Sequence, residues 1–271
     1  MGVTVRGRLT LGNSIPVLTG GLQMYLDASD QRSYKGTGNT WFDLTGNGFN
    51  FIDDPSYAQG STFVSEGGTS HFSWDNSSSI NHYFQVPQNT DLSLGVAGTN
   101  PTLSYSFWAR FDRTSYTGSQ AVVGMGVDRR EFDSSGNTVV DGVLNYSTSY
   151  RAIDTDNSVM ELNSDPFAIN ANQTVSSFIG EWNNYTYVLE YPTSTTRRVY
   201  FYINNVEYSA SQGAQNTAQN EDFTLDALTN ITLAKGNLIG DIATFSLYNV
   251  ALSPSQVTEN YNRLKSRFGH S

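Results

Sequence analysis

The sequence contains no cysteine among its 271 residues, which excludes disulfide bonds and thiolate zinc sites. Basic residues are also few: 15 Lys and Arg stand against 25 Asp and Glu, so the net charge is −10. No segment gathers enough Lys or Arg to follow a phosphate backbone. Nucleic acid and an anionic membrane surface are therefore not expected as partners.

Long apolar runs are missing as well. The first residues, MGVTVRGRLTLGNSIPV, alternate polar and apolar side chains and lack the apolar core of a secretory signal. No later stretch approaches the length of a membrane span. We therefore expect a chain that is made in the cytoplasm without a secretion signal and that can still leave the cell by lysis or inside a particle.

Aromatic residues are abundant, with 16 Tyr and 15 Phe, and they allow a sizeable core at an apolar content of only 38%. Alternating or apolar runs separated by Gly, Asn and Ser predict many short strands. These strands are expected at 22–28, 82–87, 102–111, 121–127, 142–148, 183–191, 197–205, 230–236 and 239–249. Within 102–111, one face should carry Leu103, Tyr105, Phe107, Ala109 and Phe111.

A single helix is predicted within 253–269. Ser253 suits the N-cap, Pro254 suits the first helical position, and Gln256 completes a capping box. Gly269 is a suitable stop. The apolar residues on one face are Val257, Tyr261, Leu264 and Phe268.

Many strands, one terminal helix and no break in composition predict one all-β domain. We expect a two-sheet antiparallel sandwich of jelly-roll type over 20–271. An N-terminal extended arm is expected over 1–19, where Pro16 ends an alternating run.

The two ends of the chain carry a family resemblance. GLQMYLDASDQRSY with TWFDLTGNG near the start, and LIGDIATFSLYNVALSPSQVTENYNRLKSRFG at the end, resemble concanavalin A-like domains of the laminin-G-like or pentraxin-like type. The similarity covers roughly 20–269 and implies a concanavalin A-like sandwich. This form of opening and ending is similar to domains in structural proteins of tailed bacteriophages, cyanophages especially, which implies a virion component.

The stretch 25–48 is rich in Asp and Gly. YKGTGN is not followed by the Gly-Lys-Ser/Thr of a phosphate loop. The Gly and Asn residues of LTGNG suit tight turns, and Trp41 and Phe42 are expected to pack beneath them. The stretch is interpreted as a loop that defines the fold.

A structural calcium ion is the cofactor to consider, since calcium accepts oxygen ligands from Asp, Asn and carbonyl groups in loops. The resemblance implies that Asp241, at the start of the penultimate element, can help to bind calcium near the opening segment. Asp27, Asp30 and Asp43 are the further candidate ligands. Alternatively, these acids cap turns and accept hydrogen bonds from backbone amides.

Glycan binding needs an exposed aromatic ring beside polar groups. The candidates for stacking on a sugar are Trp74, Tyr116 and Tyr146, which lie in Asn- and Ser-rich contexts. Alternatively, aromatic residues this numerous fill the sandwich.

Catalysis is not expected. The glucanase signature Glu-x-Asp-x-x-Glu lacks its second Glu in EFDSSG, residues 131–136, which fits a hairpin turn instead. His71, His82 and His270 are not accompanied by a Gly-x-Ser-x-Gly nucleophile elbow.

The leading hypothesis is therefore a non-enzymatic virion protein: a capsid decoration (cement) protein, or a fibre or spike subunit, fixed to a neighbour through its arm. Its partners would be other virion proteins and further copies of itself, as a homotrimer. The alternative is a lectin-like, glycan-binding module for adhesion or receptor binding. A glycan hydrolase has only the fold in its favour.

Overall fold

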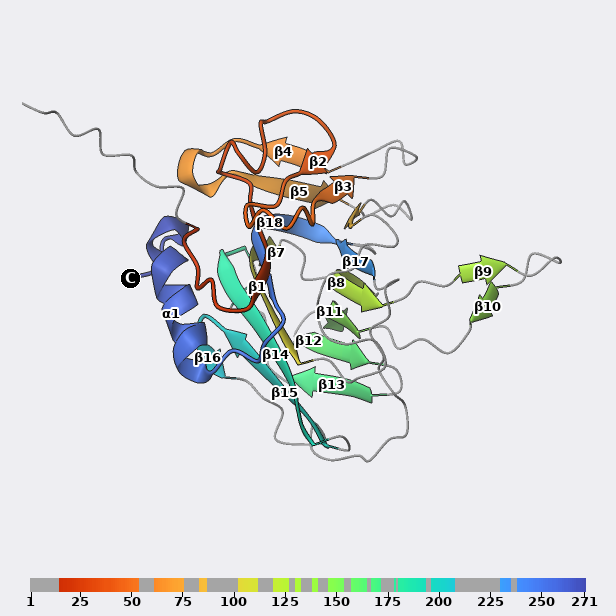
Figure 1. Cartoon of the computed structure of the whole chain (residues 1–271). Coiled ribbons are helices and arrows are strands. Elements are labelled where there is room, and N and C mark those ends of the chain that lie inside the picture. The colour runs from red at the N-terminus through yellow and green to blue at the C-terminus, as the bar shows by residue number, and fades with distance from the viewer. Residues whose placement is uncertain are drawn as a thin grey trace, which may run out of the picture.

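A computed structural model of the chain shows a β-sandwich with a helix against one face (Figure 1). The residues that it describes are 15–53, 61–75, 83–86, 102–111, 119–126, 130–132, 138–140, 146–153, 157–164, 167–171, 178, 180–193, 196–207, 230–234 and 238–271. Within these residues, no helix is long and apolar enough to cross a membrane.

Sheet A has eight strands in the order β16-β15-β14-β7-β18-β5-β4, with β1 also paired to β18. Its strands are β1 (Leu22–Asp27), β4 (Thr62–Val64), β5 (His71–Asp75), β7 (Leu103–Phe111), β14 (Asn183–Thr193), β15 (Thr196–Ile203), β16 (Val206–Glu207) and β18 (Ile239–Tyr248). All of its pairings are antiparallel.

Sheet B also has eight strands, in the order β13-β12-β11-β8-β17-β6-β3-β2. Its strands are β2 (Thr40–Trp41), β3 (Phe51–Asp53), β6 (Phe84–Gln85), β8 (Ser119–Gly126), β11 (Tyr146–Ile153), β12 (Asn157–Ser164), β13 (Phe167–Ala171) and β17 (Asn230–Leu233). A separate pair joins β9 (Arg130–Phe132) to β10 (Thr138–Val140). The predicted fold class, an antiparallel sandwich of jelly-roll type with a short C-terminal helix, is confirmed.

Strand β18 organises sheet A because three strands pair with it. One edge pairs with β7 along its length. The other edge pairs first with β5, over Ile239–Ile242, and then with β1, over Thr244–Tyr248. The C-terminal end of β1 and the start of β5 therefore meet along one edge of β18.

The main core lies between the sheets. The five alternating residues predicted to share a face of β7 all belong to this core, as expected for a strand buried on one side by a second sheet. The opposite face of β7 carries Trp108, which is buried under the C-terminal helix. Both faces of sheet A are thus covered (Figure 1).

The covering helix is α1 (Pro254–Leu264), continued by the 3-10 helix η3 (Lys265–Phe268). Ser253 caps α1 in a capping box with Gln256, and Gly269 ends η3 in the left-handed conformation at φ 82°, as predicted. The four predicted apolar residues of this helix pack in one cluster with Trp108. Trp108 stacks on Phe268 at 4.2 Å between ring centroids.

Residues 15–19 lie against this second cluster. Val17 is buried in it, and the backbone amide of Leu18 donates to Asn260 Oδ1 at 2.8 Å. Asn260 is itself held because its Nδ2 donates to the Tyr248 hydroxyl at 3.0 Å. The described part of the expected arm therefore packs on the sandwich, while residues 1–14 lie outside the described part of the chain.

Candidate functional site

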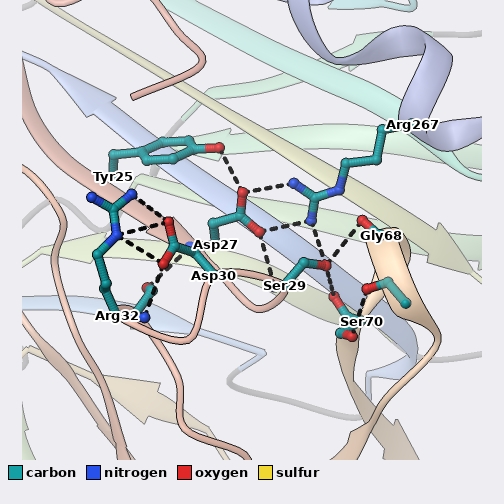
Figure 2. A network of polar contacts seen from close by, with 10 residues as sticks. Tyr25, Asp27, Ser29, Asp30, Arg32, Gly68, Ser70 and Arg267 are labelled. Atoms are coloured by element: carbon teal, nitrogen blue, oxygen red, sulfur yellow. Dashed lines mark hydrogen bonds and ion pairs between the residues drawn. The ribbon is translucent and has the colours of Figure 1, made fainter. Parts of the chain in front are cut away.

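The end of β1 carries a buried ion pair to the end of the chain. Arg267, on η3, donates to the two oxygens of Asp27 at 2.6 and 2.7 Å (Figure 2). The side chains are only 7% and 19% exposed for Asp27 and Arg267. Such a two-point contact fixes both position and orientation.

Neighbouring groups complete the coordination of Asp27. The Tyr25 hydroxyl donates to Asp27 Oδ2 at 3.0 Å, and the amide of Ser29 donates to Oδ1 at 2.9 Å. Burial first, and the Asp27 charge second, raise the pKa of Tyr25 well above its usual range. Arg267 also donates to Ser29 Oγ, and Ser29 donates to the carbonyl of Gly68, which lies within η1 (Gly67–Thr69). The network therefore ties β1, η1 and η3 together.

Asp30 and Arg32 form a second, more exposed pair beside the first (Figure 2). Arg32 Nε lies 3.0 and 3.1 Å from the two Asp30 oxygens, and Nη2 donates to Oδ2 at 2.5 Å. These hydrogen bonds lower the pKa of the Asp30 carboxyl. The Asp30 carboxylate also accepts from the Arg32 amide, as turn-capping acids do.

Asp43 organises the loop that follows β2. Its Oδ1 accepts from the amides of Tyr25 and Thr45, each at 3.0 Å. Its Oδ2 accepts from the Thr45 hydroxyl and from the amide of Gly48 at 3.2 Å. This carboxylate holds the loop against β1, so the interpretation of LTGNG as a turn that defines the fold agrees with its contacts.

Asp241 belongs to a third cluster on the helix-facing side of sheet A. Arg110 Nε donates to Asp241 Oδ2 at 2.7 Å, and Nη2 of the same arginine lies 2.7 Å from the same oxygen. His71 Nε2 lies 3.6 Å from Oδ1. The guanidinium of Arg110 also lies over the Trp182 ring, 5.2 Å from its centroid.

The four candidate calcium ligands thus have protein donors. Within the described residues, no group of three or more His, Asp or Glu side chains is arranged to hold a metal ion. Asp27 and Asp30 lie in one network, but two arginines face them. Asp30 and Asp43 cap turns, as in the alternative interpretation. Asp27 and Asp241 form ion pairs with arginines that are distant in the sequence.

Trp74, one of the three aromatic residues predicted to stack on a sugar, lies in the core. Trp74 on β5 is 2% exposed, and its ring packs edge-on against Phe84 at 5.9 Å. Its ring is therefore not available for stacking at the surface. Tyr116 lies outside the described residues, and Tyr146 begins β11, where only the backbone is described.

Phe42 has an exposed aromatic ring that the sequence did not predict. The expectation that it packs beneath its loop is wrong: Phe42 is 40% exposed, whereas Trp41 is fully buried in the core. Neighbouring residues in an extended segment point to opposite sides, so the two rings could not both face inward. This alternation in the sequence indicates that one of the two rings is exposed.

Comparisons with known proteins support the fold. No family model matches the sequence, and no curated protein matches it. Domain 4 of AbnA, a GH43 extracellular arabinanase from Geobacillus stearothermophilus solved with arabinotriose, is similar in structure at a TM-score of 0.60 and 16% identity. The match covers 90% of this chain and 100% of that domain.

Two toxin domains are similar as well. The binding domain of Paraclostridial Mosquitocidal Protein 1 matches at a TM-score of 0.57 and 16% identity, over 92% of this chain and 55% of that one. The receptor binding domain of botulinum neurotoxin D matches at 0.54 and 14%, over 89% and 52%. This chain thus spans about half the length of the two toxin structures. The TM-scores establish a shared β-sandwich fold, and at identities this low they establish the fold alone.

Proposed function

We propose that this protein is a non-catalytic, glycan-binding module that serves attachment. The observation that carries the proposal is the match to domain 4 of AbnA, because it covers that entire domain and because the domain was solved with arabinotriose. Function lies in sites rather than in folds, so the match directs the experiment and does not replace it.

The ion pairs of the buried carboxylates support a role without catalysis. Glycoside hydrolysis needs two carboxyl groups that flank one bond of the substrate. Among the residues whose burial is described, the buried carboxylates are those of Asp27 and Asp241, and each is bound by an arginine within the fold. Each holds together segments that are distant in the sequence, which is a structural task.

A glycan array tests this proposal. The purified chain should bind a restricted class of oligosaccharides reproducibly, and the measurement should be repeated in calcium and in EDTA. Loss of binding in EDTA would indicate a calcium-dependent site. A blank array from a chain that unfolds cooperatively in urea would overturn the glycan-binding proposal.

We propose a virion role as the second candidate, in which the sandwich decorates a capsid or forms part of a fibre or spike, as a homotrimer. The supporting observation is that Val17 and Leu18 are held on α1, so whatever precedes residue 15 is joined to the sandwich at a fixed point. Deleting residues 1–14 should abolish association with virion proteins while leaving the urea midpoint unchanged. Normal assembly of the truncated chain would contradict attachment through the arm.

A further inference from the structure

Phe42 presents an aromatic ring to solvent directly after β2. Among the residues whose burial is described, three large hydrophobic side chains are exposed: Phe42, Val206 and Val250. Phe42 is the aromatic one of the three, at 40% exposure. A single exposed apolar residue is ordinary on its own, but the backbone that carries Phe42 is held by hydrogen bonds at both its amide and its carbonyl.

The backbone of Phe42 is fixed from a buried hub. Its amide donates to the Ser33 carbonyl at 2.7 Å, and the Ser33 hydroxyl donates to the Phe42 carbonyl at 2.6 Å. Ser33 is fully buried, and its Oγ also accepts from the amide of Asp27 at 3.1 Å. The next residue, Asp43, is held by Asn50 and by its own four acceptor contacts. A residue whose backbone is held in this way loses little backbone entropy when it binds a ligand.

Polar residues lie near Phe42 in the two segments that its backbone joins. Arg32 precedes Ser33, and its guanidinium is oriented by Asp30. Further along the chain, the exposed Asn47 is anchored because its Nδ2 donates to the Gln23 carbonyl at 2.8 Å. The Thr45 hydroxyl oxygen, which donates to Asp43, lies 3.1 Å from the same carbonyl. Hydroxyl, amide and guanidinium groups in the segments that carry an exposed aromatic ring are of the kind that recognises a sugar.

We infer that the Phe42 strip, made of Arg32, Phe42, Thr45 and Asn47, binds a neutral oligosaccharide with one sugar ring against Phe42. This inference rests on the proposed glycan-binding function. The neutral class follows from charge: the chain carries a net charge of −10, and the guanidinium of the strip is paired with Asp30. An anionic glycan would meet the repulsive field of a chain with this net charge.

The test uses the full-length chain and three variants on one array of neutral and sialylated oligosaccharides. Phe42→Ala removes the ring, Phe42→Trp keeps an aromatic face, and Val206→Ala is the control because Val206 is 53% exposed on the β15–β16 hairpin. The strongest neutral binder of the array is then titrated by calorimetry. Lactose and 3′-sialyllactose are compared as a matched neutral and anionic pair.

Phe42→Ala should weaken the titrated oligosaccharide about tenfold or more, which corresponds to about 1.4 kcal/mol. Phe42→Trp and Val206→Ala should stay within about twofold of the original chain, and sialyllactose should bind no better than lactose. Urea unfolding of each variant checks that the fold is kept.

The outcomes separate the inference from the proposed function. If the original chain binds no array member, the proposed function and this inference both fail. If the original chain binds but Phe42→Ala binds equally well, the inference fails while glycan binding stands. A preference for sialylated over neutral glycans would overturn the neutral class.

Discussion

Replacing Arg267 with alanine tests the contact that joins the end of the chain to its first strand. The substitution removes two hydrogen bonds to Asp27, at 2.6 and 2.7 Å, and one to Ser29 Oγ at 2.8 Å. The Asp27 side chain, 7% exposed, then lacks its counter-charge. Removing one partner of a buried ion pair costs about 3–5 kcal/mol.

We expect the lower end of that range, about 3 kcal/mol of unfolding free energy. Two donors remain on Asp27 after the substitution, namely the Tyr25 hydroxyl and the Ser29 amide. Water can also reach the space left by Arg267, whose side chain is 19% exposed. The measurement is urea unfolding followed by tryptophan fluorescence, with an unchanged m-value as the check that the unfolded state is the same.

A matched control lies on the preceding helix. Arg263 pairs with Glu259 at i,i+4, but these side chains are 42% and 50% exposed. Arg263→Ala should therefore cost less than about 0.5 kcal/mol. In a cycle with Asp27→Asn, the double variant should be about 2 kcal/mol less destabilised than the sum of the single variants, because each single change leaves a buried partner behind. Equal losses for the two arginine variants, or additive losses in the cycle, would refute the reasoning.

Alkaline pH should weaken the fold through Tyr248, because burial raises its pKa to about 12. Because the pKa in the folded state exceeds the unfolded value of about 10, the stabilisation is fully present below about pH 10. About 2 kcal/mol of unfolding free energy should be lost as the pH rises from about 10 to about 12. Tyr248→Phe should lack this part of the loss in urea titrations at rising pH, and parallel curves would contradict the assignment. Gly240→Ala should cost about 2–4 kcal/mol in the same assay, since its φ is +152° and an added Cβ would lie 2.5 Å from the Arg110 carbonyl oxygen. Gly38→Ala, with φ +100° and open space, should cost only about 1 kcal/mol, and equal costs would show that the close approach is unimportant. Millimolar calcium should change the melting temperature by less than about 1 °C, because Asp27 and Asp43 already have protein donors, and a rise of several degrees would restore the calcium hypothesis.

The C-terminal helix could be predicted in detail because its signals are local. Capping by Ser253 and Gln256 depends on residues three positions apart, and the apolar face follows from the period of the helix. The inward face of β7 could be predicted for the same reason, since alternation in a long strand allows only two assignments. Local patterns therefore predicted the C-terminal helix and the inward face of β7.

Exposure of single aromatic residues could not be predicted in the same way. Alternation requires Trp41 and Phe42 to point apart, but it does not say which ring faces the core. Trp74 stands in a polar context, yet its position in β5 turns it toward Phe84 on the opposite sheet. Which side of a short strand is inward depends on the register of the whole sheet, and register is set by distant pairings.

The role of Asp27 shows why an acidic loop is weak evidence for a metal site. Its partner, Arg267, lies 240 residues away, so nothing in the loop itself distinguishes a calcium ligand from half of an ion pair. The pair forms where β1, which pairs with β18, and η3 pack in one cluster on the helix-facing side of sheet A. The segments that resemble the concanavalin A-like family are then the segments that close this fold, the opening strand and the terminal helix. Asp27 and Arg267 are fixed by contact with each other, whereas core packing does not hold the ring of Phe42, which is 40% exposed.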